Sequence, residues 1–109
     1  MTIREMTAVR ENKYPILQDV LTTLRNLQPY LYERWGVTEL AVFGSVARGE
    51  AGIESDVDIL FDYDRPLGLE FMALAYFLEE KLGFDVDLLS KKAIRPRTWD
   101  FIRDEMRYV

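Results

Sequence analysis

The sequence predicts one small α/β (α+β) domain, in which helices flank a small mixed three-stranded sheet. The chain has 109 residues, which is about the length of one domain. Hydrophobic residues make up 49% and charged residues 30% of it, a balance typical of globular proteins. Helical and strand-like apolar patterns follow one another in the order helix, strand, strand, helix, strand, helix.

The first 13 residues mix charges with isolated apolar side chains, so we expect a polar lead-in over residues 1–13 and a single domain over residues 14–109. This lead-in has no apolar run of signal-peptide length, and nothing along the chain approaches the length of a membrane span. We therefore expect a cytoplasmic protein with no membrane contact.

The first helix is expected to start at Pro15, because proline is tolerated in a first turn and leucines then recur at helical spacing. Pro29 lacks the N–H that continues a helix, so we expect a break near residues 27–28 and a second short helix ending at Trp35. Gly36 is a natural stop after it.

The other elements follow from short apolar runs, which predict strands, and from breaker-free runs of good helix formers, which predict helices. Glycine and proline separate these runs. The expected strands cover residues 38–43, 57–63 and 84–90, and the expected helices cover residues 69–82 and 97–107.

The composition excludes several kinds of chemistry. There is no cysteine and no histidine, so disulfides, thiolate metal sites and an imidazole general base are impossible. Any catalytic metal ion should be a hard one held by oxygen. The net charge is −5, and because phosphate neutralisation needs a basic surface, we expect no direct nucleic-acid binding.

Carboxylates alternate with apolar residues in two of the expected strands. Asp56 and Asp58 share one face of the second strand, and Asp85 and Asp87 share one face of the third. If the two strands are neighbours, three or four carboxylates converge on an open face. Such a cluster repels itself unless a cation such as Mg²⁺ offsets the charge.

A glycine-serine pair, Gly44-Ser45, lies just ahead of the first carboxylates. Glycine lets a backbone approach a phosphate closely, and the serine adds a hydroxyl donor. Taken singly, such a pair is usually only a turn, and two alternating aspartates usually mark a solvated strand face. Together they suit a nucleoside triphosphate bound with Mg²⁺.

This combination resembles a known signature. Gly44-Ser45, ten residues and then Asp56-x-Asp58 is similar to the signature of the DNA polymerase beta-like nucleotidyltransferase superfamily. The stretch "FGSVARGEAGIESDVDIL" resembles the minimal nucleotidyltransferases (MNT), antitoxins encoded beside HEPN-domain toxins. The resemblance covers roughly residues 15–109.

The resemblance implies a nucleotidyltransferase fold and a set of residue roles. Gly44 and Ser45 match the pair that holds the triphosphate. Asp56, Asp58 and Asp87 match the catalytic, metal-binding carboxylates, which hold Mg²⁺, expected as two ions. The implied reaction transfers AMP from ATP to a tyrosine of a cognate HEPN toxin and silences its RNase activity.

Two further charged residues are less determined by the sequence. Arg48, in the stretch "ARGE", either contacts phosphate as part of the nucleotide site or supports the loop by pairing with a carboxylate. Asp85 lies outside the family pattern, and we expect it to be peripheral.

The length leaves room only for a catalytic core, so the acceptor should be presented by a partner protein in a hetero-oligomer. Phe101, Tyr108, Phe71 and Tyr76 are candidate contacts, whereas Trp99 is expected in the core. Two alternatives stay open. The protein could be an antitoxin that only binds and occludes the toxin, or a small-molecule nucleotidyltransferase whose acceptor site is built by an oligomer.

Overall fold

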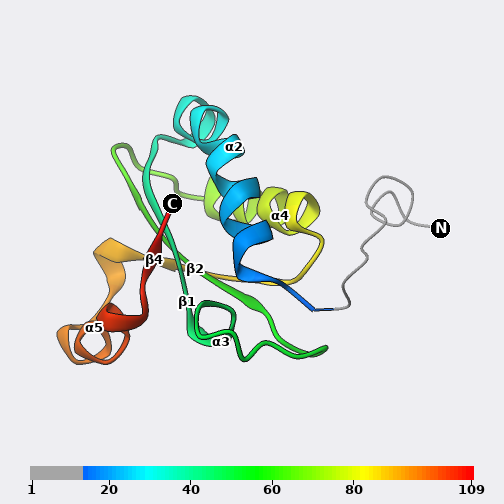
Figure 1. The fold of residues 1–109 in the computed structure, drawn as a ribbon. Coiled ribbons are helices and arrows are strands. Elements are labelled where there is room, and N and C mark those ends of the chain that lie inside the picture. The colour runs from blue at the N-terminus through cyan, green and yellow to red at the C-terminus, as the bar shows by residue number, and fades with distance from the viewer. Residues whose placement is uncertain (1–13) are drawn as a thin grey trace.

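The computed structural model describes residues 14–109, and the lead-in expected over residues 1–13 lies outside this range. The expected α/β class is confirmed (Figure 1). In chain order the elements are α2 (Leu17–Trp35), β1 (Val37–Phe43), α3 (Gly44–Ala47), β2 (Val57–Tyr63), α4 (Glu70–Leu82), β3 (Val86–Ser90), η1 (Lys91–Ala93), α5 (Pro96–Ile102), η2 (Arg103–Glu105) and β4 (Arg107–Tyr108).

The sheet is mixed and has four strands in the order β3-β2-β1-β4. The central strands β1 and β2 are antiparallel, β3 runs parallel to β2, and β4 runs antiparallel to β1. The second strand was predicted with its observed bounds, because its apolar run ends sharply in turn residues on both sides. The parallel pairing of β2 and β3 makes the two carboxylate-bearing strands neighbours.

Two helices cover one face of this sheet, which we call the helical face. Figure 1 shows α2 and α4 on this side and α5 on the other. Val57, Ile59 and Phe61 of β2 are fully buried in the helical-face core, together with Leu24 of α2 and Leu74 of α4. The opposite face, which we call the open face, holds a smaller cluster around Ala41, Leu60 and Met106.

The predicted break in the first helix is wrong, because α2 runs unbroken from Leu17 to Trp35 with Pro29 inside it. A proline inside a helix costs about 3 kcal/mol. Leu24 precedes it and Leu31 and Trp35 follow it, and all three are buried in one core, so their burial offsets that cost. At 19 residues α2 is the longest helix within residues 14–109, and none of the helices described there is long and apolar enough to cross a bilayer.

The C-terminal segment also differs from the prediction. Its helix ends at Ile102 rather than continuing to residue 107, and a fourth strand, β4, follows a 3₁₀ turn. Met106 is buried against the open face, and the backbone N–H of Val109 donates to the carbonyl of Leu40. Packing onto β1 therefore ends the helix early and adds a fourth strand to the sheet.

Candidate functional site

The alternation of side chains along β2 places Asp58 on the open face. Val57 and Ile59 are fully buried under the helices, whereas Asp58 between them points to the other side and is partly exposed. Successive side chains of a strand point to opposite faces, so the residues that anchor β2 in the core also orient Asp58.

The register of the sheet aligns three of the predicted site residues. Asp58 is paired with Asp87 on the parallel strand β3 and with Phe43 on the antiparallel strand β1. Gly44 directly follows Phe43, so the glycine-serine turn begins next to Asp58. Asp56 precedes β2 by one residue and is exposed. The condition set in the sequence analysis, that the two carboxylate-bearing strands are neighbours, is therefore met, and Asp58 lies beside Asp87.

The electrostatics of Asp58 reflect this crowding. Its pKa is raised from 3.8 to about 6, first by burial and then by the negative charge of Asp87. Smaller contributions come from the negative charges of Asp56 and Glu105, and the positive charge of Arg48 opposes them. A cation at this place would relieve the same repulsion.

The carboxylates fit a hard metal ion by the kind of donor they offer, since Mg²⁺ and Ca²⁺ prefer carboxylate oxygens. Within residues 14–109, however, no three acidic side chains are arranged so as to hold a metal ion between them. The structure therefore brings Asp58 and Asp87 side by side without assembling a closed set of three ligands.

The turn at Gly44 requires glycine for two reasons. Its φ of 73° lies in the left-handed region, which side chains rarely adopt. A Cβ added to Gly44 would also overlap Oδ2 of Asp58. Ser45 follows in the short helix α3, and its carbonyl accepts the backbone N–H of Glu50 at 2.9 Å. The backbone of the turn at Gly44 therefore packs directly against the carboxylate of Asp58.

Arg48 pairs with carboxylates in this structure. Its Nη1 donates to Oε2 of Glu105 at 2.7 Å, and its Nε donates to Oε2 of Glu50 at 3.2 Å. The hydrogen bond to Glu105 is the main cause that raises the pKa of the Arg48 guanidinium. Of the two roles left open for Arg48, the observed contacts match loop support.

Glu105 is the residue of this region that the sequence analysis missed. Its Oε1 accepts the backbone N–H of Gly44 at 3.3 Å, 61 positions away along the chain. No local spacing announces such a contact, because it depends on where the 3₁₀ turn η2 and the buried Met106 place the side chain.

The aromatic candidates divide into core and surface residues. Trp99 packs with the open-face cluster, as expected, and Phe71 packs against the helical-face core with its ring 5.9 Å from that of Phe61. Phe101, Tyr76 and Tyr108 are exposed at 87%, 62% and 50%. These three therefore remain available for contact with a partner.

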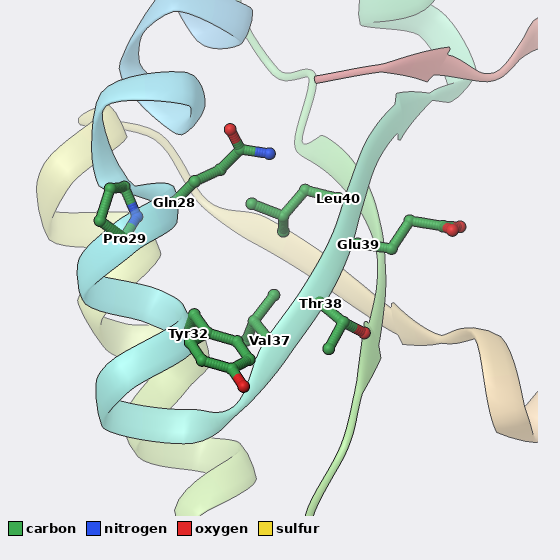
Figure 2. Close-up of a pocket in the computed structure, with 7 residues that line it drawn as sticks. All are labelled: Gln28, Pro29, Tyr32, Val37, Thr38, Glu39 and Leu40. Atoms are coloured by element: carbon green, nitrogen blue, oxygen red, sulfur yellow. The ribbon is translucent and has the colours of Figure 1, made fainter.

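A cavity of about 330 Å³ lies away from the carboxylates, between the middle of α2 and the first half of β1 (Figure 2). None of the predicted site residues lines it. Its wall consists of Gln28, Pro29, Tyr32, Val37, Thr38, Glu39 and Leu40.

Comparison with known families tests the family that the sequence analysis expected. Residues 24–109 match the family model described as a nucleotidyltransferase domain. The chain belongs to this family. The prediction that it is a nucleotidyltransferase is thereby confirmed, and the region matched includes the Gly44 turn, Asp58 and Asp87.

Individual relatives agree with this assignment. "Protein adenylyltransferase MntA" of Thermococcus cleftensis is 40% identical over 94 residues, which are 85% of this chain and 95% of that protein. "Putative protein adenylyltransferase" of Methanocaldococcus jannaschii is 37% identical over 97 residues, with 85% and 97% covered.

A solved structure described as "Structure of putative minimal nucleotidyltransferase" superposes with a TM-score of 0.68 at 36% identity. The superposition covers 84% of this chain and 94% of the solved chain. The four-stranded sheet with α2 and α4 on its helical face is therefore the minimal nucleotidyltransferase fold.

Proposed function

We propose that this nucleotidyltransferase transfers AMP from ATP, with Mg²⁺, to a tyrosine of a cognate HEPN RNase toxin and so acts as its antitoxin. The observation that carries the proposal is the register of the sheet, which places Asp87 beside Asp58 and pairs Asp58 with Phe43, the residue directly before the Gly44 turn. The names of the relatives, which specify protein adenylyltransferases, support a protein as the acceptor.

Each residue of the predicted site has a role in this proposal. Gly44 and Ser45 bind the triphosphate, and Arg48 contacts it once nucleotide is bound. Asp56, Asp58 and Asp87 are the carboxylates that would hold Mg²⁺, as two ions. Bound there, Mg²⁺ supplies charge stabilisation to the attacking and leaving oxygens.

The proposed reaction consumes only ATP and the tyrosine hydroxyl. The tyrosine oxygen forms a bond to the α-phosphorus of ATP, the bond from that phosphorus to the bridging oxygen breaks, and pyrophosphate leaves. Asp87 accepts the hydroxyl proton, a task that falls to a carboxylate because the chain has no histidine.

The acceptor tyrosine belongs to the partner, and the exposed aromatic residues Tyr76, Phe101 and Tyr108 offer contacts for a hetero-oligomer. Aromatic side chains provide large apolar contact areas at interfaces. ATP is a cytoplasmic metabolite, so we place the reaction in the cytoplasm.

The test is transfer of labelled AMP. The protein is incubated with α-labelled ATP, Mg²⁺ and the toxin encoded beside it, and label on the toxin is the expected result. Asp58→Asn should abolish labelling. Asp85→Asn makes the same change at an exposed position outside the aligned pair, and it should label normally.

Two results would contradict the proposal. One is absence of label on the toxin, measured beside an active adenylyltransferase as a control. The other is full protection of toxin-expressing cells by Asp58→Asn, which would indicate neutralisation by occlusion alone.

A further inference from the structure

One carboxylate bridges the two ends of the loop that the proposed function assigns to phosphate binding. Oε1 of Glu105 accepts the backbone N–H of Gly44 at 3.3 Å, and its Oε2 accepts Nη1 of Arg48 at 2.7 Å. Each oxygen therefore accepts from one donor. The two donors lie at the two ends of α3, since Gly44 is its first residue and Arg48 directly follows its last.

The side chain of Glu105 is held in this place by its neighbours. Met106, directly after it, is buried in the open-face cluster, and β4 then pairs with Ala41 and Val42 of β1. The side chain of Glu105 is only 21% exposed, whereas that of Asp104, one residue earlier, is 95% exposed. Adjacent acidic residues thus have opposite environments.

A carboxylate at this position offers the two donors what a phosphate would offer them, namely anionic oxygens. Its charge also reaches Asp58, whose carboxyl is already crowded by Asp87 and Asp56. A triphosphate that binds at Gly44 and Arg48 therefore meets a carboxylate that already accepts from both of these donors. It also meets the added negative charge of Glu105 near Asp58.

We propose that Glu105 is a further residue of the nucleotide site, whose carboxylate occupies the anion position at Gly44 and Arg48 and is displaced when a triphosphate binds. This inference rests on the proposed nucleotide site. Glu105 then sets the affinity for the triphosphate, because Gly44 and Arg48 become free to bind phosphate only when the carboxylate leaves them.

The experiment measures binding by calorimetry, with inorganic triphosphate and with ATP, both in Mg²⁺. Glu105→Gln keeps the size of the side chain and removes its charge, and it should bind both ligands about three- to tenfold more tightly than the unmodified protein. Asp104→Asn makes the same charge change on the exposed neighbour and should stay within about twofold.

A second variant keeps the test decisive if thermal melting shows that Glu105→Gln folds poorly. Glu105→Asp retains the charge but shortens the side chain by one methylene, so it reaches the two donors less well. It should also bind triphosphate more tightly, by a smaller factor. In an Arg48→Gln background the gain from Glu105→Gln should shrink, because the main partner of Glu105 is gone.

The outcomes separate this inference from the proposed function. Unchanged or weaker binding by Glu105→Gln, with normal binding by the unmodified protein, overturns the inference alone and makes Glu105 a support for the turn. Failure of the unmodified protein to bind either ligand overturns the nucleotide site and the inference with it.

Discussion

The two faces of the sheet have the same strands and different tasks. On the helical face, Val57, Ile59 and Phe61 of β2 are sealed beneath α2 and α4 with no exposed surface. On the open face, the alternate position Asp58 lies beside Asp87 and is only partly covered. One strand thus supplies the centre of the core and the centre of the candidate site.

This difference shows how a chain of this size combines a stable core with a site of crowded carboxylates. Crowded carboxylates destabilise a folded protein unless a cation offsets them. Here Asp58 is flanked in sequence by two fully buried residues, so the core fixes the strand and the strand fixes the carboxylate. Changes on the helical face should therefore affect stability first, and changes on the open face should affect function first.

The largest effect is expected on the helical face. Phe61→Ala removes a fully buried ring from the core and should lower the free energy of unfolding by about 3–5 kcal/mol. Urea unfolding measured by circular dichroism tests this value. A loss below about 1.5 kcal/mol would mean that the core under α2 and α4 is not closely packed around the ring.

A smaller loss is expected at the turn between the faces. Gly44→Ala forces a side chain onto a positive φ and into the carboxylate of Asp58, so it should cost about 2 kcal/mol and stop AMP transfer. Gly49→Ala is the matched control, since its φ is 74° and an added Cβ meets nothing within 4 Å.

Gly49→Ala should therefore cost only about 1 kcal/mol and leave AMP transfer intact. Equal losses of stability and of transfer in the two variants would show that the contact with Asp58 does not matter. Thermal melting and the labelled-ATP assay measure both quantities on the same samples.

A gain in stability is expected at Asp58 itself. Its pKa is about 6 in the folded protein and 3.8 ordinarily, so the folded state disfavours the charged form. The penalty is fully present above pH 6 and disappears as the pH falls below about 4. A shift of this size corresponds to about 3 kcal/mol at most, and solvent screening of the partly exposed group reduces it to about 1 kcal/mol.

Asp58→Asn should therefore unfold at a higher urea concentration than the unmodified protein at pH 7.5, measured without divalent cations, and the two should converge near pH 4. Asp85→Asn, at an exposed position, is the matched control for replacing a carboxylate by an amide. A loss of stability in Asp58→Asn at pH 7.5 would show that the carboxylate is satisfied rather than crowded.

The smallest effect on stability is expected at Phe101. Its side chain is 87% exposed, so Phe101→Ser should change the free energy of unfolding by less than about 0.5 kcal/mol. The affinity of this variant for the proposed toxin partner, measured by surface plasmon resonance, should fall if this ring is part of the interface. Unchanged affinity would remove Phe101 from the contact surface.

How far the sequence predicts this molecule depends on the range of the interactions involved. The bounds of β2 follow from local alternation and were predicted. The pairing of Asp58 with Asp87 was expected only on the condition that their strands are neighbours, which local alternation does not determine. Pro29 was misjudged because its local cost is offset by the burial of distant residues such as Trp35.

The contacts of Glu105 were missed for a related reason. They exist only because β4 pairs with Ala41 and Val42, far away along the chain, and two residues are too short a strand to leave a pattern in the sequence. The sequence therefore singled out the aspartates of the candidate site and missed Glu105, the carboxylate that contacts its turn.

The central claim, that the open face binds the nucleotide, is tested most directly by amide NMR spectra recorded while ATP and Mg²⁺ are added. The predicted result is a set of shifts centred on Gly44, Ser45, Asp58 and Asp87, with the residues of α2 and α4 little changed. Shifts confined to the cavity around Gln28, Tyr32 and Leu40 would contradict it, as would an unchanged spectrum.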